Sequence, residues 1–325
     1  MTEAIRVHEV GGPEQLKHES VRVPEPGPGE VRLRHTHIGV NYIDIYFRTG
    51  LYPAGNLPFT PGLEGAGEVV ATGEGVRTLK PGQRVAYAGG PLGAYAAERI
   101  MPADRVVPLP EGIRNEQAAG MMLKGMTAHM LLERVHPVQP GEQVLIHAAA
   151  GGVGLMLCQW AKHLGATVIG TVGSPEKAEL AKAHGCDHPV LYRDEDVVNR
   201  VKELTGGEGV AVAYDSVGAD TLLASLACLA RRGMLVSFGQ SSGKPPAIEV
   251  GQLAAGGSLF LTRPSLFDYI ATPEALQSAA EALFAVVSRG ALDVRIGQSL
   301  PLADAAAAHR ALASRQSTGS TILTV

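Results

Sequence analysis

The sequence predicts an α/β protein of two domains, one rich in short β-strands and one built on a doubly wound parallel sheet. Residues 1–123 are dense in Pro and Gly between short β-rich runs, for example 31–35 and 67–70. Such punctuation is typical of short strands joined by turns. From about residue 140, apolar strand-like runs alternate with segments of helical period. That alternation predicts a parallel sheet with helices on both faces.

The parallel sheet is expected to begin with a strand at 144–148. A helix follows, because apolar residues recur at helical spacing at Val153, Leu157, Trp160 and Leu164. The next strand is expected at 167–172. Ser174 then caps a helix that has Pro175 in its first turn and Gly185 past its end. Further strands are expected at 190–192, 210–214, 235–238 and 258–261.

The final segment, 265–325, contains two alanine-rich helices and a β-like run at 320–325. It is too short to form a stable domain by itself, so we expect it to return to the first domain. The predicted domains are therefore a β-rich domain of residues 1–123 and 267–325 and an inserted parallel-sheet domain of residues 124–266. We expect a ligand-binding cleft between the two.

The composition argues against several classes of function. With 325 residues, of which 45% are hydrophobic and 18% charged, the chain is long enough to bury a sizeable core. A net charge of −4 without blocks of Lys or Arg disfavours nucleic acid as a partner. Apolar runs of about 18 residues and a signal-like amino terminus are both missing, which predicts a cytoplasmic protein that binds no membrane. The three cysteines fit a reducing compartment without disulfides.

A glycine turn joins the strand at 144–148 to the helix after it. Gly151 lets backbone approach a pyrophosphate, and Gly154 lets the helix pack against the strand. The helix N-terminus then offers N–H groups and the positive end of its dipole to phosphates. The dinucleotide pattern G-x-G-x-x-G is met with Ala149 at its first position. The turn therefore predicts a dinucleotide cradle, and a turn without a ligand is the alternative.

The end of the second strand favours NADPH over NADH. NAD-selective folds place an acidic residue about 20 residues after the glycine turn, whereas this sequence reads Thr171-Val172-Gly173-Ser174 there. A carboxylate beside a 2′-phosphate would cost roughly 4 kcal/mol at about 4 Å and an effective dielectric of about 20. From the first turn of the next helix, Lys177 can place its ammonium group beside the 2′-phosphate, and Ser174 and Tyr192 supply hydroxyl donors. A helix cap, a solvated cation and a strand-end aromatic are the alternative roles of these three.

Six motifs occur in order along the chain, at 8–14 (HEVGGPE), 39–44 (GVNYID), 61–67 (PGLEGAG), 123–128 (LKGMTA), 148–154 (AAAGGVG) and 214–218 (YDSVG). Each of these six different motifs occurs once. Through their order and spacing, the chain resembles the zinc-independent, zeta-crystallin-like quinone oxidoreductases of the medium-chain dehydrogenase/reductase superfamily. The resemblance covers essentially the whole chain. It implies an α/β protein with a GroES-like β-rich catalytic domain and a Rossmann domain that binds NADPH.

The resemblance also implies functional residues. Asn41, Tyr46 and Tyr52 are expected at the nicotinamide and the substrate, where an amide bonds an oxygen and a tyrosine donates a proton or stacks on a ring. Structural hydrogen bonding and packing are the alternatives for these residues, and Lys124 is either a helix-start residue or a catalytic group. The expected cofactor-binding residues are Asn41, Thr127, Gly151, Gly152, Val153, Gly154, Gly173, Ser174, Lys177, Tyr192, Ser216, Phe238, Gly239, Gln240, Ser241, Thr262, Arg263, Pro264 and Arg315.

No metal site is expected. The zinc alcohol dehydrogenases of this superfamily hold their catalytic metal through Cys and His at places where this chain has Asn41 and Leu63, and their lobe of four cysteines has no counterpart here. Asn and Leu cannot replace thiolate and imidazole ligands.

The predicted function is NADPH-dependent reduction of a quinone. Reduction of an activated C=C bond in an enone or alkenal is the enzyme alternative. An RNA-binding or structural, crystallin-like role is the alternative from another class, and the acidic balance argues against it. The apolar strand at 258–261 lies near the end of the sheet, so we expect it to pair with its copy in a homodimer.

Overall fold

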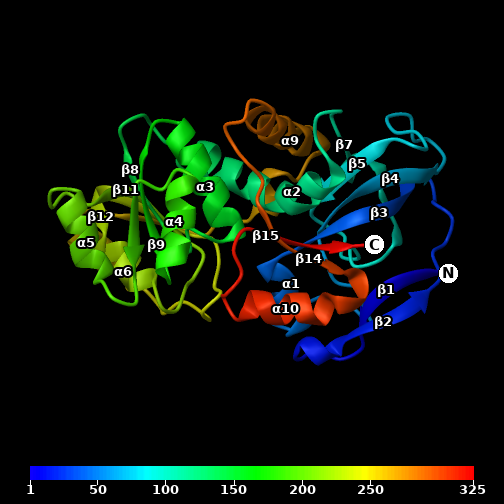
Figure 1. The fold of residues 1–325 in the computed structure, drawn as a ribbon, viewed down its shortest axis with the longest axis horizontal. Helices are drawn as coiled ribbons and strands as arrows, with labels where there is room; N and C mark the ends of the chain where they lie inside the picture. Colours follow the sequence, from blue (N-terminus) through cyan, green and yellow to red (C-terminus); the bar gives the residue numbers. More distant parts are fainter. The chain divides into compact units, whose positions relative to one another are not determined.

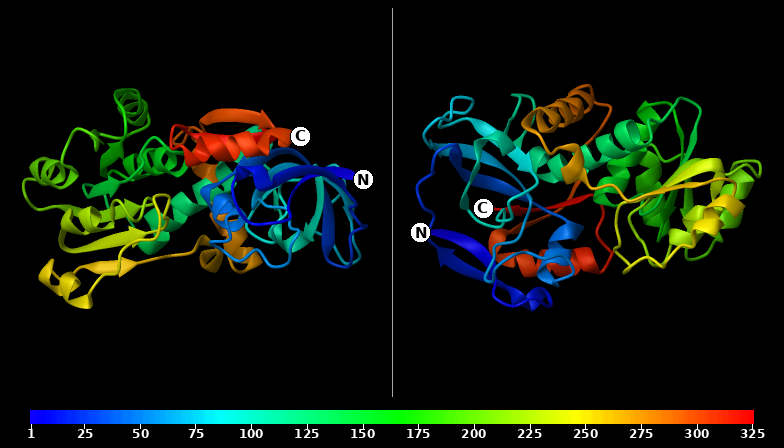
Figure 2. Two further views of the ribbon diagram at one scale, coloured as in Figure 1. Left: turned by 90° about the horizontal axis from the view of Figure 1, so that it is seen from below. Right: turned by 180° about the vertical axis from the view of Figure 1, so that it is seen from behind.

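The computed structural model describes all residues, 1–325 (Figure 1). The chain forms two compact units. Unit 1 comprises Met1–Met126, Ile270–Ser288 and Val294–Val325, and unit 2 comprises Thr127–Tyr269 and Arg289–Asp293. Both ends of the chain therefore lie in unit 1 (Figure 2). The α/β fold class is confirmed, and the domain boundaries at 123/124 and 266/267 stay predictions.

Unit 1 is built on a seven-stranded sheet whose path runs β14-β15-β3-β4-β5-β7, with β6 paired to β3. The last strand, β15, is parallel to β14 and antiparallel to β3, so the C-terminal segment completes this sheet. A separate antiparallel pair, β1 (Thr2–Val7) and β2 (Leu16–Val21), is drawn in blue in Figure 2. The other strands are β3 (Glu30–Val40), β4 (Glu64–Thr72), β5 (Arg84–Ala88), β6 (Glu98–Pro102), β7 (Val107–Pro108), β14 (Ile296–Pro301) and β15 (Ser320–Thr324).

The core of unit 1 draws apolar side chains from β1, β3 and β5 and from helix α10, with Tyr87 and Tyr95 fully buried among them. Helix α1 starts directly after β3, so the short link between them holds Asn41 in a buried position. The helices are α1 (Tyr42–Arg48), α2 (Asn115–His129), α9 (Pro273–Ser288) and α10 (Ala305–Ala313), with short 3₁₀ turns η1 (Pro13–Gln15), η2 (Ala103–Arg105) and η4 (Leu302–Asp304).

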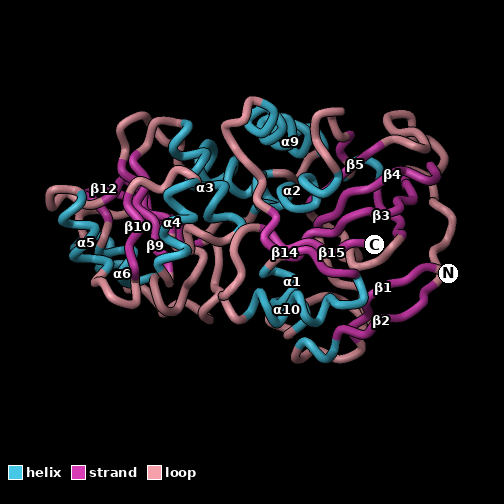
Figure 3. Tube along the Cα trace, in the orientation of Figure 1, coloured by secondary structure: helices cyan, strands magenta, loops and turns pink.

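Unit 2 is built on a six-stranded parallel sheet in the order β10-β9-β8-β11-β12-β13. The chain winds outward from β8 in one direction and from β11 in the other, which places the switch point between these two strands. Helices lie beside the strands (Figure 3). The strands are β8 (Gln143–Ile146), β9 (Thr167–Val172), β10 (His188–Leu191), β11 (Val210–Asp215), β12 (Leu229–Ser237) and β13 (Phe260–Thr262). The helices are the π-helical η3 (Met130–Val135), α3 (Gly152–His163), α4 (Pro175–Ala183), α5 (Val197–Leu204), α6 (Leu222–Ala227), α7 (Val250–Ala255) and α8 (Leu266–Tyr269).

Several predicted strand limits are wrong; β12, for example, begins at Leu229 and not at Leu235, and β10 spans His188–Leu191 and not 190–192. At two other limits the cause is a residue in the left-handed region. Strand β8 ends at Ile146 and not at Ala148, because Ala148 has a φ of 53° and leaves the extended region. Strand β13 begins at Phe260 and not at Ser258, whose φ is 60°. Strand β9, in contrast, spans the predicted residues 167–172.

Candidate active site

The glycine turn lies between β8 and α3, as the sequence predicts. Gly151 is the N-cap of α3, with a φ of −79° and a ψ of 173°. A Cβ at Gly154 would lie 2.2 Å from the carbonyl oxygen of Ala148, so α3 can meet the turn only with glycine there. At the first motif position Ala149 is accommodated by Gly170 on β9, where a Cβ would lie 2.7 Å from that of Ala149. The neighbouring strand thus compensates for the departure from the glycine pattern.

A second group of predicted residues follows β9 and the neighbouring strand β10. The Ser174 hydroxyl accepts from the Lys177 amide at 3.4 Å and caps α4. A Cβ at Gly173 would lie 2.8 Å from the hydroxyl oxygen of Tyr192, so glycine leaves room for the tyrosine. Burial, and then the charge of Arg193, lower the pKa of Lys177. The charges of these two cations therefore interact at this strand end, and sequence reasoning missed Arg193.

A third group follows β11, β12 and β13. The Arg263 guanidinium donates to the Gly239 carbonyl at 3.4 Å and to the Gln240 side-chain oxygen at 3.3 Å. The Ser241 amide donates to the Ser216 carbonyl at 3.2 Å. These bonds join the predicted segments 238–241 and 262–264 to the loop after β11. Because the strands are parallel, all three groups lie at the carboxyl edge of the sheet, where open α/β sheets bind ligands.

Other predicted residues lie elsewhere in the chain. Thr127 is half-buried in α2, at the start of unit 2. Arg315 is exposed after α10 in unit 1, with a φ of 57°. Unit 1 also contains Asn41, Tyr46 and Tyr52. The grouping of these residues with the carboxyl edge of the parallel sheet in unit 2 stays a prediction.

A buried ion pair lies against Asn41. Lys124 Nζ is 3.0 Å from Glu64 Oε2, and the two side chains are 7% and 0% exposed. The same carboxylate oxygen accepts from Asn41 Nδ2 at 2.8 Å, and Glu64 Oε1 accepts from the Leu123 amide at 2.7 Å. Because a carboxylate only accepts, the Asn41 amide is oriented with its NH₂ group toward Glu64.

Sequence reasoning missed the role of Glu64, and the helix-start interpretation of Lys124 is wrong because Lys124 lies well inside α2. Each residue is a single charge within an apolar or small-residue stretch, 62–67 for Glu64 and 121–126 for Lys124. A charge in a stretch that is expected to be buried needs a partner. The two isolated and opposite charges could therefore have been predicted to pair with each other.

A chain of hydrogen bonds connects the two ends of α1. Arg48 Nη1 donates to His309 Nδ1 at 3.1 Å, which places the proton of the neutral imidazole on Nε2. His309 Nε2 bonds the Tyr95 hydroxyl at 3.0 Å, and that hydroxyl donates to Asp44 Oδ2 at 3.0 Å. Asp44 also accepts from the Asn41 backbone amide at 2.8 Å. This series of hydrogen bonds therefore ends at the backbone amide of Asn41, the N-cap residue of α1.

The titration of this chain is set by burial. Burial lowers the pKa of His309 to about 3, and the charge of Arg48 adds to the effect. Burial raises the pKa of Asp44 to about 7, although the hydrogen bonds from Asn41 and Tyr95 act to lower it. Asp44 Oδ1 is buried without a hydrogen-bond partner, which adds to the cost of its charge.

Tyr46 and Tyr52 belong to an aromatic cluster. Their ring centroids are 5.1 Å apart in an edge-to-face arrangement, and Phe47 lies 5.8 Å from Tyr52. Tyr46 is buried and Tyr52 half-buried. These contacts are what the packing alternative predicts, and they also hold Tyr52 beside α1.

The side chains that commonly bind metals do not cluster in the structure. No three or more His, Cys, Asp or Glu side chains come together in a group that could hold a metal ion. The thiols Cys158, Cys186 and Cys228 are free and buried. None of the helices combines the length and the apolar character needed to cross a membrane.

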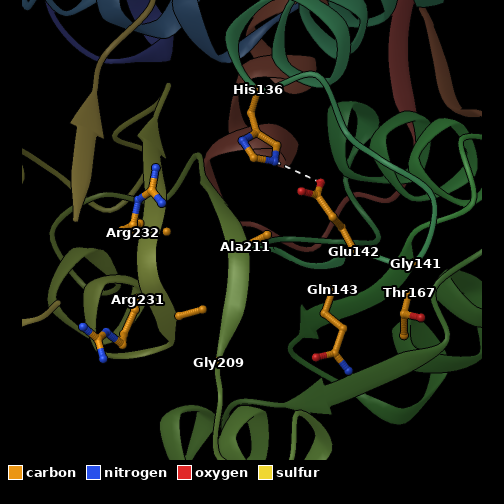
Figure 4. A pocket seen from close by; sticks show the side chains of 11 residues that line it. His136, Gly141, Glu142, Gln143, Thr167, Gly209, Ala211, Arg231 and Arg232 are labelled. Atoms are coloured by element: carbon orange, nitrogen blue, oxygen red, sulfur yellow. Dashed lines mark hydrogen bonds and ion pairs between the residues drawn. The ribbon is translucent and has the colours of Figure 1, made fainter. Parts of the chain in front are cut away.

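A pocket of about 420 Å³ lies at the opposite, amino edge of the parallel sheet (Figure 4). Within it, His136 Nε2 is 3.0 Å from Glu142 Oε2. Gln143, which lines the pocket, is the first residue of β8, whereas the glycine turn follows the last residue of β8. The pocket is therefore no part of the candidate site. It is lined by His136, Gly141, Glu142, Gln143, Thr167, Gly209, Ala211, Ala230, Arg231, Arg232 and Gly233.

Two domain families match the chain. Residues 27–111 match the alcohol dehydrogenase GroES-like domain, and residues 152–283 match the zinc-binding dehydrogenase family. A quinone oxidoreductase of Pseudomonas aeruginosa is 51% identical over 323 residues, which cover 99% of both chains. A 2-haloacrylate reductase of a Burkholderia species is 46% identical over 329 residues, again 99% of both. The solved structure of Escherichia coli quinone oxidoreductase complexed with NADPH matches with a TM-score of 0.97 at 47% identity, over 99% of this chain and 100% of that one.

These matches extend over both units and agree with the order of the sequence motifs. Relatives this similar over the whole chain share one family, and the resemblance seen in the sequence is confirmed. The chain belongs to the quinone oxidoreductase family of the medium-chain dehydrogenase/reductase superfamily.

Proposed function

We propose that the protein uses NADPH to reduce quinones. The observation that carries the proposal is the carboxyl edge of the parallel sheet, where a glycine turn opens onto α3 and Lys177 and Arg193 follow the neighbouring strands. The quinone oxidoreductases that are 47% to 51% identical to this chain support the substrate class. The NADPH complex of the Escherichia coli protein supports the cofactor.

The residues of unit 2 fit NADPH. The first amides of α3 have no carbonyl within the helix to bond, so they are available to a pyrophosphate. Lys177 and Arg193 match a 2′-phosphate, and Ser174 and Tyr192 add hydroxyl groups. Glu176, the one acid in the first turn of α4, is exposed. Bound NADPH would supply a hydride from its nicotinamide ring.

On the substrate side we assign Asn41, Tyr46 and Tyr52. Glu64 holds the buried Asn41 amide in one orientation, and the two tyrosines offer aromatic surface to a quinone ring. Because a reduced quinone is an aromatic hydroquinone, the reaction needs little acid catalysis. These side chains therefore have to orient the substrate and exclude water.

The cofactor assignment is tested by titrating the protein with NADPH and NADH and following nicotinamide fluorescence. The wild type is expected to prefer NADPH, and Lys177→Ala is expected to lower that preference by about tenfold, because one charge-assisted bond to the 2′-phosphate is lost. Lys182→Ala is the matched control, since Lys182 on the same helix pairs with Glu179 at 3.0 Å on the surface. An unchanged preference for NADPH in Lys177→Ala would refute the assignment.

Reduction of an activated C=C bond is a second candidate function, favoured by the 46% identity to the 2-haloacrylate reductase. The same hydride geometry serves an electron-poor alkene. Rates of NADPH oxidation should be compared for 1,4-benzoquinone, 1,2-naphthoquinone, 2-chloroacrylate and a simple enone. Turnover of the alkenes alone would overturn the quinone proposal.

We also propose that the protein acts as a cytoplasmic homodimer without a nucleic-acid partner. Strand β13 is the edge of its sheet, and Phe260 and Leu261 on it are 53% and 39% exposed. An apolar edge strand of this kind is removed from water when it pairs with its copy. Light scattering at micromolar concentration is expected to give twice the chain mass of 33.9 kDa, and the single mass would contradict the dimer.

A further inference from the structure

Four polar side chains are buried in a row beneath the glycine turn. Asp215 ends β11, His147 follows β8, Thr171 lies near the end of β9, and Ser225 projects from α6. They are between 0% and 3% exposed. The row has no part in the proposed contacts to cofactor or substrate, so its position at this edge of the sheet needs another explanation.

The hydrogen bonds of the row run in one direction. The Ser225 hydroxyl donates to Asp215 Oδ2 at 2.8 Å, so its oxygen accepts from His147 Nε2 at 2.9 Å. His147 Nδ1 then carries no proton and accepts from the Thr171 hydroxyl at 2.9 Å. Thr171 Oγ1 in turn accepts from the Ala148 amide at 3.3 Å. Burial lowers the pKa of His147, which keeps the imidazole neutral as this order requires.

The row ends on the residue whose backbone is strained. Ala148 has a φ of 53°, a conformation that residues with a Cβ disfavour. Thr171 holds two consecutive amides of the turn, Ala148 through its hydroxyl and Ala149 through its carbonyl at 3.0 Å. At the other end, Asp215 accepts from the Gly218 amide at 3.0 Å. The row therefore connects the end of β9 with the loops after β8 and β11, and these three strands are neighbours.

We infer that His147 and Thr171 are positioning residues that hold the glycine turn in the form that admits a pyrophosphate. They act through the backbone of Ala148 and do not touch the cofactor. A fully satisfied buried network of this kind rigidifies the segment it bonds. The inference rests on the proposed NADPH site, because the turn is the part of that site which the row supports.

Hydrogen exchange of the ligand-free protein tests the row independently of any cofactor. Thr171→Val removes the hydroxyl that accepts from Ala148 and keeps the side-chain volume. The Ala148 amide is expected to exchange at least about tenfold faster than in the wild type. Thr171→Ser, which restores the hydroxyl, is expected to exchange at nearly the wild-type rate. An Ala148 amide that exchanges equally in the valine variant and the wild type would overturn the inference.

Binding of NADPH is the second measurement. Thr171→Val is expected to raise the dissociation constant about threefold to tenfold, the range that one net hydrogen bond represents, with recovery in Thr171→Ser. The matched control is Thr205→Val. Thr205 is also buried in unit 2, but its hydroxyl accepts from the Gly209 amide at 2.9 Å at the amino edge of the sheet. The control is expected to lose stability and to bind NADPH like the wild type.

His147→Gln keeps the inference testable if Thr171→Val does not fold. Glutamine can still donate to Ser225 through its amide nitrogen, but it has no acceptor at the position of the imidazole Nδ1 that Thr171 bonds, so NADPH binding should weaken and the Ala148 amide should exchange faster. If the wild type itself does not bind NADPH, the proposed function fails while the exchange result still stands. If the wild type binds and the Thr171 variant binds as tightly as Thr205→Val, the positioning role alone is refuted.

Discussion

Replacing Lys124 by Met should lower the free energy of unfolding, because Glu64 in unit 1 then lacks the cation that pairs with it in the interior. At the observed 3.0 Å, the attraction between the two charges is about 5–6 kcal/mol at an effective dielectric of about 20. Removing one partner of a buried pair costs about 3–5 kcal/mol. The amides of Leu123 and Asn41 still bond Glu64 in the variant. We therefore expect a loss near the lower end, about 3 kcal/mol.

Urea unfolding followed by circular dichroism is the assay. Tryptophan fluorescence is unsuitable, because the single Trp160 lies in unit 2 and the ion pair lies in unit 1. Glu64→Gln and the double variant complete a double-mutant cycle, and the double variant should lose less than the sum of the single losses. A loss below about 1 kcal/mol for Lys124→Met is the value of an exposed ion pair and would refute the reasoning.

Three further predictions concern the turn, pH and a buried hydroxyl. Gly154→Ala places a Cβ 2.2 Å from the Ala148 carbonyl and should weaken NADPH binding at least about tenfold in a titration. Gly251→Ala, whose Cβ meets nothing within 4 Å, is the control, and equal affinities would contradict the steric account. The pKa of His309 is about 3 in the folded protein and 6.5 in the unfolded chain, so His309 lowers the free energy of unfolding as the pH falls from 6.5 to about 3. The pKa of Asp44 is about 7 folded and 3.8 unfolded, so Asp44 raises the free energy of unfolding as the pH falls from about 7 to 3.8. The urea midpoint of His309→Gln should therefore fall less on acidification than that of the wild type, and an equal fall would show that His309 is not the cause. Thr321→Val should leave the free energy of unfolding unchanged or raise it by up to about 1 kcal/mol, since its buried hydroxyl has no partner; a clear loss in urea would contradict this.

The features predicted correctly from the sequence are local. Strand β9, the Ser174 cap and the glycine turn each depend on residues within a few positions of one another, where strand pattern, capping and glycine conformation act directly. The order of the motifs then identified the family. The misplaced end of β8 is also local, but the left-handed Ala148 that causes it is stabilised by Thr171 from the next strand.

By itself, the sequence determined the α/β class, the parallel sheet, the position of the dinucleotide turn and the family. Only the tertiary structure decided which polar groups are paired. Lys124 finds its carboxylate 60 positions away, and Arg48 reaches His309 across 261 positions. The physical reason is that a buried charge or hydroxyl is satisfied by any partner that the folded backbone brings within about 3 Å, whatever its distance along the chain. The sequence shows that such groups need partners, and folding selects them.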